Sequence, residues 1–446
     1  MTTSVHGPAP ETVGSPRSRR ALVAGSVGNF IEWYEFGVYG YFATIIAANF
    51  FTPEGGSDVE GLIKTYASFA LAFFFRPVGA TIFGRVGDRI GRRPTLILVV
   101  LLMTGATTLI GLLPTYATMG AAAPWLLTLL RALQGLSAGG EFGGAVSIMT
   151  EFAPPGRRGL YGSWQSFTVA LGLLGGAGMA ALLATVLTET DLTSWGWRVP
   201  FLLTLPMGLV ALWLRLRLEE TPAFRRTRQA PSDAPADPAT LRAVRPRTGE
   251  VAKAIALGAG RIMGWSAAGY TFLVVMPSYL QGTLNATFQQ ALVATVAANL
   301  GFAAAIIPAG MLSDRIGRRA VMLAGAALAA VLAFPLLNLL QDPGAANPAK
   351  GLAVFAAGAV VGLMAGPGPA MLAEMFPTSA RYTGLGLAYS LSNAVFSGCA
   401  GLIITELIKR TGDVDIPAYY VVVTCAVSAM ALLTLRGDDH RRSLRD

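Results

Sequence analysis

Charged residues are scarce in this sequence: Asp, Glu, Lys and Arg make up 13% of its 446 residues, against about 25% in soluble proteins. Apolar residues make up 53%, and the mean hydropathy is +0.54. A water-soluble fold with so few charges could not cover this much apolar surface. The composition therefore predicts a membrane protein.

Histidine and cysteine are almost absent. The two histidines, His6 and His440, stand near the two ends of the chain, which argues against histidine catalysis, a histidine metal site or a histidine proton relay within the membrane. The two cysteines, Cys399 and Cys425, lie in apolar runs, and we interpret them as small packing residues. With no nucleophile–base pair or metal cluster visible, we expect neither an enzyme nor a bound cofactor.

A duplicated motif divides the chain. Gly84–Arg93 (GRVGDRIGRR) is repeated at Gly310–Arg319 (GMLSDRIGRR), and the two aspartates, Asp88 and Asp314, are 226 residues apart. A second pattern repeats at an offset of 223, with Glu151, Pro154 and Arg158 matched by Glu374, Pro377 and Arg381. Two independent motifs at nearly one offset indicate a duplicated unit of a little over 200 residues.

Apolar runs long enough to cross about 30 Å of hydrocarbon fill both halves. We predict twelve helices, at roughly 21–50, 61–86, 94–113, 124–153, 160–188, 199–218, 251–280, 288–313, 320–340, 351–376, 383–410 and 417–436. The predicted fold is an all-α membrane protein with two six-helix bundles, 21–218 and 251–436, and a charged cytoplasmic linker, 219–250. A disordered cytoplasmic tail is expected at 1–20 and a short cytoplasmic tail at 437–446. We expect no cleavable signal, because the first apolar run is long and carries two carboxylates.

Basic residues predict the orientation. When Lys and Arg residues near the span ends are counted with the adjoining loops, three of the 34 lie deep within predicted spans and five lie in one set of alternate loops. This leaves 26 on the side of the N-terminal tail. Cytoplasmic loops carry such an excess, so both termini are expected in the cytoplasm. The net charge of +9 is explained by this topology and by anionic lipid headgroups, without nucleic acid.

Two carboxylates lie deep in the first span. Glu32 and Glu35 share a helical face with Asn29 and Tyr39, about 17–21 Å from the cytoplasmic end at a rise of 1.5 Å per residue. Burial and mutual repulsion favour a protonated carboxyl group, so this pair is a candidate proton carrier. The alternative is that both carboxylates are held in ion pairs with neighbouring helices.

Arginines also lie within spans. Arg76 could neutralise Glu32 or Glu35, or bind a substrate carboxylate. Arg131 shares an arc of its span with Gln134 and Glu141, on a glycine-rich helix that allows close packing. Arg131 and Glu141 lie about 15 Å apart along the helix axis, so we expect each to find its partner on another helix. In the second half, Arg261 is the clear case of a charge deep within a predicted span. The candidate substrate-binding residues are Asn29, Tyr34, Arg76, Gln134, Gln165, Arg261, Trp265, Tyr389 and Asn393, and Trp164 is a further candidate cavity-lining residue. Pro367 and Pro369 should break or bend span ten.

Five segments, NFIEWYEFGVYGYFA, FFFRPVGATIFGRVGDRIGRR, RALQGLSAGGEFGGA, WGWRVPF and EMFPTSARYTG, resemble the metabolite:proton symporter family of the major facilitator superfamily, whose members include proline/betaine, α-ketoglutarate, citrate and shikimate transporters. The resemblance implies a central cavity, alternating access and proton-coupled uptake. Our hypothesis is that Glu35, helped by Glu32, carries the proton, and that Arg131 and Glu141 tune this proton site. Arg76 and Arg261 would face the substrate carboxylate from opposite bundles. The resemblance also implies an intracellular gate, which we expect to comprise Asp88, Arg89, Arg92, Arg93, Glu151, Arg158, Asp314, Arg315, Arg318, Arg319, Glu374 and Arg381. Arg261 departs from the family pattern, and the short C-terminal tail carries no coiled coil for osmotic sensing.

We therefore expect a multi-pass protein of the plasma (inner) membrane that imports a small carboxylate-bearing metabolite with protons as the coupling ion. Its partners would be that small molecule and the lipid bilayer, not nucleic acid, and we expect a monomer. Exporters of drugs or metabolites in the same fold remain an alternative, and a channel or receptor fits the duplicated loops less well.

Two classes of substrate fit the sequence. A zwitterion such as proline or betaine needs one anion site and an aromatic pocket, which Tyr34, Trp164 and Trp265 could supply. A di- or tricarboxylate needs two or more cations, which Arg76, Arg131 and Arg261 could supply.

Overall fold

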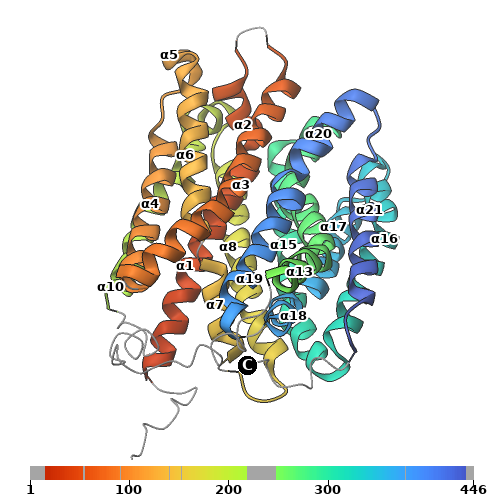
Figure 1. Cartoon of the computed structure of the whole chain (residues 1–446). Helices are drawn as coiled ribbons and strands as arrows, with labels where there is room; N and C mark the ends of the chain where they lie inside the picture. Colours follow the sequence, from red (N-terminus) through yellow and green to blue (C-terminus); the bar gives the residue numbers. More distant parts are fainter. Residues whose placement is uncertain are drawn as a thin grey trace, which may run out of the picture.

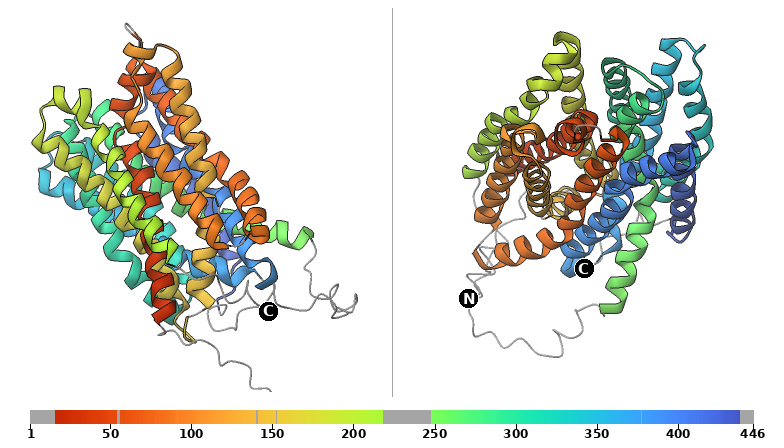
Figure 2. Two further views of the ribbon diagram at one scale, coloured as in Figure 1. Left: turned by 90° about the vertical axis from the view of Figure 1, so that its left-hand side faces the viewer. Right: turned by 90° about the horizontal axis from the view of Figure 1, so that it is seen from above.

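Each of the twelve predicted apolar ranges contains helix in the computed structural model, which describes residues 16–53, 56–90, 92–139, 141–151, 153–217, 248–376 and 378–437. Within these described residues the structure contains helices and no strand. The helices of the first half (red to yellow-green) and of the second half (green to blue) form two groups that stand side by side (Figures 1 and 2). This arrangement agrees with the predicted all-α fold in two halves.

The first half runs from α1 to α10. Its elements are α1 (Pro16–Tyr41), α2 (Ala43–Ile46), the π-helical η1 (Ala47–Phe51), α3 (Asp58–Ile90), α4 (Arg92–Leu112), α5 (Tyr116–Met119), α6 (Ala122–Ala138), α7 (Glu141–Glu151), α8 (Arg158–Val186), α9 (Glu189–Asp191), η2 (Leu192–Gly196) and α10 (Arg198–Leu216). The structure thus starts the first helix at Pro16, five residues before the predicted span. Proline suits the first turn of a helix, where its missing N–H needs no partner.

The second half runs from α13 to α21. Its elements are α13 (Thr248–Tyr270), η3 (Thr271–Val275), α14 (Met276–Gly282), α15 (Phe288–Ile316), α16 (Arg318–Gln341), α17 (Asn347–Ala365), α18 (Gly368–Met375), α19 (Thr378–Ser392), η4 (Asn393–Gly398), α20 (Ala400–Thr411) and α21 (Ile416–Leu433). Residues 1–15, 218–247 and 438–446, which contain most of the predicted tails and linker, lie outside the described residues.

Eight helices in the described residues are long and apolar enough to cross a membrane. A further apolar helix in the described residues, 97–112, is shorter than these eight. Span ten is broken as predicted, because α17 ends at Ala365 and α18 begins at Gly368. Span four is not the single helix that we expected, since α6 ends at Ala138 and α7 begins at Glu141.

The duplicated motif is a helix connection. In the second copy α15 ends at Ile316, Gly317 turns with φ +95°, and α16 begins at Arg318. Only glycine adopts this φ without strain. The first copy places the end of α3 and the start of α4 at the corresponding residues, Ile90 and Arg92. Both copies lie at the lower end of the molecule in Figure 1, which we call the arginine-rich end.

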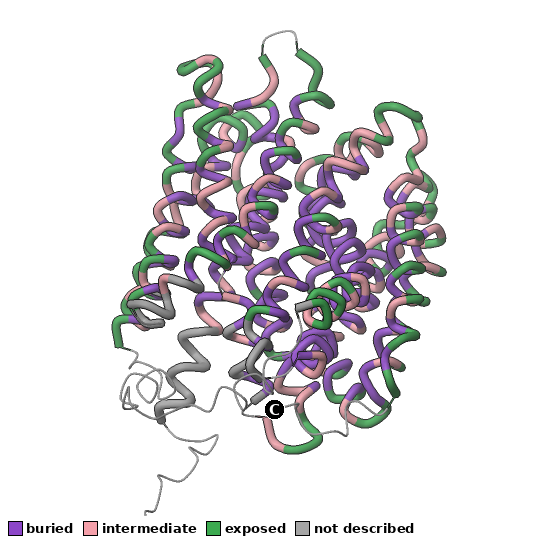
Figure 3. The backbone as a smooth tube through the Cα atoms, viewed as in Figure 1, coloured by how far each residue is buried: buried purple, intermediate pink, exposed green. Residues whose placement is uncertain are grey.

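Buried residues concentrate in the interior, and exposed residues lie on the outer faces (Figure 3). Many exposed positions are large apolar side chains, among them Trp125, Leu182, Val331 and Leu352, as expected for surfaces that face lipid. At the centre α8 packs against both α1 and α15 and thereby joins the two halves.

Candidate functional site

A buried ion pair links α1 to α3. Nη2 of Arg76 lies 3.2 Å from Oε1 of Glu32, and both side chains are almost completely buried. The Arg76 guanidinium also lies 4.3 Å from the ring centre of Phe36 and 4.5 Å from that of Phe73. Of the roles that the sequence left open for Arg76, neutralisation of Glu32 is the one that this conformation contains.

A chain of hydrogen bonds connects the second arginine to the second carboxylate. Nη1 of Arg131 donates to Oε1 of Gln134 at 2.6 Å, and Nε2 of Gln134 donates to the hydroxyl of Thr107 at 2.6 Å. The same hydroxyl lies 2.9 Å from Oε2 of Glu35. The exposed fraction of all four side chains is 0%. Arg131 was expected to find a partner on another helix, but its direct partner is one turn away on α6, because the i and i+3 positions of a helix are neighbours.

The ring of Phe36 lies between these two groups. The guanidinium of Arg76 is 4.3 Å and that of Arg131 is 5.0 Å from its centre. Nε of Arg76, Nε and Nη2 of Arg131, and Oε1 of Glu35 have no hydrogen-bond partner among the described residues. Buried polar atoms are rarely left without a partner, so this region has unused capacity to bind a polar ligand.

The second half contributes an aromatic wall. The ring of Tyr270 lies 6.3 Å from Trp33, 6.0 Å from Phe69 and 5.4 Å from Phe73, all on the first half. Its buried hydroxyl has no hydrogen-bond partner in the described part of the chain. Tyr389 stacks on Phe142 of α7 and lies 5.9 Å from Trp265. The buried charges therefore lie next to the contact between the halves.

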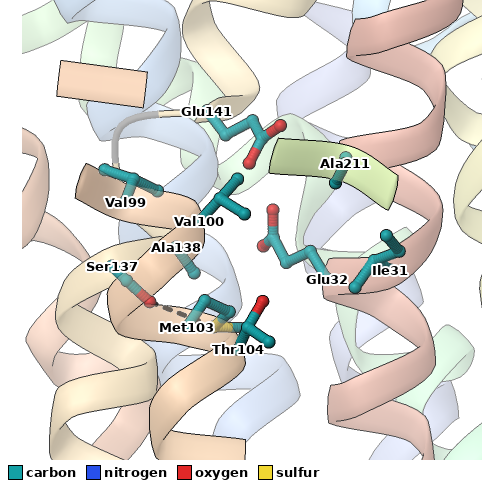
Figure 4. A pocket seen from close by; sticks show the side chains of 11 residues that line it. Ile31, Glu32, Val99, Val100, Met103, Thr104, Ser137, Ala138, Glu141 and Ala211 are labelled. Carbon is teal, nitrogen blue, oxygen red and sulfur yellow. Dashed lines mark hydrogen bonds between the residues drawn. The ribbon is translucent and has the colours of Figure 1, made fainter. Parts of the chain in front are cut away.

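Glu141 is held on a different helix from the one that carries Arg131, and it pairs with Arg215 of α10. Glu141 and Glu32 line one pocket inside the first half, together with Ser137 and Met103 (Figure 4). The prediction that Glu141 finds its partner on another helix is confirmed, although the sequence analysis did not single out Arg215.

Other predicted cavity-lining residues bind within their own half. Asn29 donates to the carbonyl of Gln165 at 3.2 Å and to Thr168 at 2.6 Å, and Nε2 of Gln165 has no hydrogen-bond partner among the described residues. Tyr34 donates to the carbonyl of Pro200, and Asn393 donates to that of Tyr389. Trp164 of α8 is 40% exposed, and its indole N–H donates to the hydroxyl of Ser26 on α1. It does not line the region between the halves.

Arg261 is not part of the Arg76 group in this conformation. It donates to the hydroxyl of Thr434 at 2.9 Å and to the carbonyl of Ala431 at 3.4 Å. Ala431 lies in the last turn of α21 and Thr434 is the C-cap of this helix, where free carbonyls and the helix dipole favour a cation. The predicted contact of Arg261 with substrate stays a prediction.

The second copy of the motif joins the two halves at the arginine-rich end. Asp314 accepts from the backbone N–H groups of Gly159 at 2.7 Å and Leu160 at 2.9 Å, in the first turn of α8. Arg318 donates to Asp314 at 2.7 Å and to Glu374 at 3.1 Å. Nη1 of Arg158 lies 3.5 Å from Oε1 of Glu374. We call Arg158, Asp314, Arg318 and Glu374 the interhalf latch.

The other predicted gate residues of the second half do not take part in the latch. Arg381 donates to the carbonyl of Ala373, and Arg319 donates to the carbonyl of Leu435. Arg315 is exposed.

The first copy of the gate cannot be compared in the same way. The side chains of Asp88, Arg89, Arg92, Arg93 and Glu151 lie outside the part of the chain that the structure describes. Their predicted roles stay predictions.

Sequence reasoning missed Thr107, Tyr270 and Arg215. Threonine and tyrosine are common in apolar spans, so neither stands out as a charge does. Arg215 lies near the end of the sixth predicted span, where it groups with the basic loop residues. Two features of the sequence could have indicated the pair. Arg215 lies one turn before the end of the sixth predicted span, and Glu141 on another helix had no predicted partner.

Comparisons with known proteins agree with this architecture. A family profile described as "Sugar (and other) transporter" matches residues 21–257, and one described as "Major Facilitator Superfamily" matches residues 261–446. The proline/betaine transporter of Salmonella typhimurium is 33% identical over 435 residues, which cover 95% of this chain and 84% of that protein. The ectoine/proline transporter of Corynebacterium glutamicum is 34% identical over 429 residues, which cover 94% and 84%.

The fold is that of a solved sugar symporter. A crystal structure of a D-xylose–proton symporter superimposes with a TM-score of 0.74 at 19% identity, over 94% of this chain and 97% of that one. The match spans both halves, and the sequence relatives confirm the family expected from the motifs. This chain therefore belongs to the major facilitator superfamily, and it is a multi-pass transporter of the plasma membrane and not an enzyme.

Proposed function

We propose that this protein imports a small zwitterion with one carboxylate, of the proline or betaine type, together with protons and by alternating access. The relatives in the comparisons carry the names of proline, betaine and ectoine transporters. No cofactor enters the proposal, and the coupling ion is the proton. Both termini and the arginine-rich end would face the cytoplasm, with twelve crossings in all.

The charge balance of the buried site carries the proposal. Arg76 and Arg131 face Glu32 and Glu35 around one phenylalanine ring. With both carboxylates ionised these four charges cancel, and one proton leaves a single positive charge. A buried site tolerates little net charge. Each proton that binds therefore leaves one positive charge that one substrate carboxylate can neutralise.

The aromatic wall supports a cationic group at the other end of the substrate. Tyr270 and Tyr389 come from the second half and lie next to rings of the first half, and Trp265 of the second half lies beside Tyr389. Aromatic faces attract ammonium groups, including quaternary ones. A substrate that touches Arg131 with its carboxylate and this wall with its cation would connect the two halves.

A di- or tricarboxylate fits this arrangement less well. It would need two or more uncompensated cations, while Arg76 is already paired with Glu32 and Arg261 is bonded to α21. Export of a cationic drug fits less well too, because the buried arginines would repel it. Export of a metabolite is the alternative in the opposite direction. It would use the same transport cycle and differ only in the gradient that drives it.

Transport in proteoliposomes tests the proposal. Under an imposed inward proton gradient, purified protein should accumulate labelled proline or glycine betaine, and a protonophore should abolish the accumulation. Glu35→Gln should lose accumulation but keep counterflow exchange, because it removes the proton carrier and leaves the arginines in place. Undiminished uphill uptake by this variant would reject Glu35 as the carrier, and preferential accumulation of citrate would reject the substrate class.

A further inference from the structure

The hydroxyl of Thr107 lies where the proton site and the arginine meet. Three polar atoms surround it: Nε2 of Gln134 at 2.6 Å, Oε2 of Glu35 at 2.9 Å and the carbonyl oxygen of Met103 at 2.9 Å. Its side chain is fully buried in α4. No charged group lies between Thr107 and Glu35, so the hydroxyl is the direct partner of this carboxyl group.

The direction of the first two hydrogen bonds is fixed by chemistry. Arginine only donates, so the atom of Gln134 that faces Nη1 of Arg131 must be the amide oxygen. The amide nitrogen of Gln134 then points at Thr107 and donates to it. Thr107 is therefore an acceptor in this bond, whatever the state of Glu35.

A hydroxyl has one proton to donate, and two acceptors compete for it. When Glu35 is ionised, Thr107 donates to it, and an unbroken series of donors runs from Arg131 through Gln134 and Thr107 to the carboxylate. When Glu35 is protonated, it becomes the donor to Thr107, whose own proton then turns to the carbonyl of Met103. The two states differ by the rotation of one hydroxyl and need no movement of the helices.

We propose that this rotation of the Thr107 hydroxyl couples the protonation state of Glu35 to the guanidinium of Arg131. In the ionised state the guanidinium of Arg131 is connected to an anion through two neutral groups. Protonation ends that connection and leaves Arg131, with Nε and Nη2 unpartnered among the described residues, to attract a substrate carboxylate. The proton then binds before the substrate. This inference rests on the proposed function and adds a positioning residue to it.

Charged groups on several helices also act on Glu35. They are Glu32 on the same helix, Arg131 on α6 and Glu141 on α7, while Tyr34 is a neutral titratable neighbour. Arg76 and Arg215 act indirectly, since they pair with Glu32 and Glu141. Variants of Thr107 leave all of these charges in place.

The test measures the titration of Glu35 without a substrate. Thermal unfolding of the purified full-length protein is followed between pH 5 and 9, and the difference between wild type and Glu35→Gln isolates this group. In Thr107→Val the half-titration point should move up by about one pH unit, because a hydrogen bond to an ionised group is stronger than a neutral one by about 1.4 kcal/mol. Thr107→Ser, which returns the hydroxyl, should restore the wild-type position.

The neighbouring threonine supplies a matched control. Thr108 lies on the same helix, and its hydroxyl is 3.4 Å from that of Thr204, away from Glu35. Thr108→Val should titrate like wild type. A wild-type titration in Thr107→Val, or an equal shift in Thr108→Val, would overturn the inference, even if Glu35→Gln abolishes coupling. Retained coupling in Glu35→Gln would instead reject the proposed function on which it rests.

A second variant covers the case in which Thr107→Val does not fold. Gln134→Met is similar in size and cannot donate to Thr107, so it cuts the same connection one residue earlier. Its half-titration point should move in the same direction as that of Thr107→Val. A folded Gln134→Met protein with the wild-type titration would overturn the inference on its own.

Discussion

At the scale of single residues, the site is a set of buried charges that compensate one another. Glu32 and Arg76 are 7% and 3% exposed in their side chains and lie 3.2 Å apart. Removal of one partner from such a pair leaves a buried charge without compensation, whereas removal of both leaves none. Stability and transport should therefore respond differently to single and double substitutions at this pair.

We expect Arg76→Gln to lower the free energy of unfolding by about 3 kcal/mol, since Glu32 loses its partner. The double variant Glu32→Gln/Arg76→Gln should recover more than half of this loss but none of the transport. Thermal unfolding in detergent and proline uptake measure the two effects. If the double variant were less stable than Arg76→Gln alone, the two side chains would not compensate each other.

The charged members of the site are predictable from the sequence because charge in an apolar span is rare. Glu32, Glu35, Arg76 and Arg131 all stand out for this reason. Thr107 does not, since its role depends on which hydrogen bonds it receives from α6 and offers to α1. Arg261 is also visible as a charge, but its partner Thr434 lies 173 residues later, a proximity that only the packing of α13 on α21 reveals.

At the scale of helices, the positions of Arg76 and Arg131 depend on how closely α3 and α6 approach. Gly135 follows Gln134 on α6, and a Cβ atom at this position would overlap the carbonyl of Ala72 on α3. Gly139 meets the backbone of Arg76 in the same manner. The glycine-rich composition of this span predicted close packing, and this expectation is confirmed.

Gly135→Ala should therefore separate α3 from α6 and destabilise the protein by about 1–3 kcal/mol, the usual cost of overpacking. Size-exclusion profiles of a fluorescent fusion report the loss of folded protein. The matched control is Gly105→Ala on α4, where no atom lies within 4 Å of the added Cβ. Alanine is the better helix former, so this control should be neutral or stabilising. Equal losses in both variants would show that the close approach is not the cause.

Helix ends were less predictable than helix positions. The predicted spans placed a helix connection between residues 313 and 320, where the structure has its turn at Gly317, and the prolines placed the break before Gly368. Proline restricts the backbone locally, and glycine permits the φ that this turn requires. The break between α6 and α7 was missed, since glycine at Gly139 and Gly140 serves equally well for packing and for a turn. Local sequence cannot separate these two uses of glycine.

At the scale of the whole molecule, the described residues join the two halves at both ends by different means. The arginine-rich end carries the interhalf latch, in which Asp314 accepts two backbone N–H groups of α8. At the opposite end Tyr66 donates to Ser278 at 3.0 Å, and the exposed pair of Lys409 and Glu60 spans 3.1 Å. Exposed pairs contribute at most about 1 kcal/mol, whereas hydrogen bonds to a buried carboxylate contribute more. Alternating access requires each end to open in turn, and this difference predicts that the end opposite to the latch opens more easily.

One cysteine reporter can follow both ends. Ser166 of α8 donates to the carbonyl of Ala365 across the halves at 2.8 Å, so Ser166→Cys, in a background with Cys399→Ser and Cys425→Ser, should react with maleimide only when the arginine-rich end opens. Asp314→Asn weakens the latch and should raise the labelling rate about tenfold, for a loss of about 1.4 kcal/mol. Tyr66→Phe weakens the opposite end and should lower the rate, because the two open states compete for one population.

Asp342→Asn is the matched control, since Asp342 also accepts a backbone N–H, from Gly344, but within a single exposed turn. If Asp314→Asn and Tyr66→Phe changed the rate in the same direction, the two ends would open independently and the halves would not alternate as the proposed transport cycle requires.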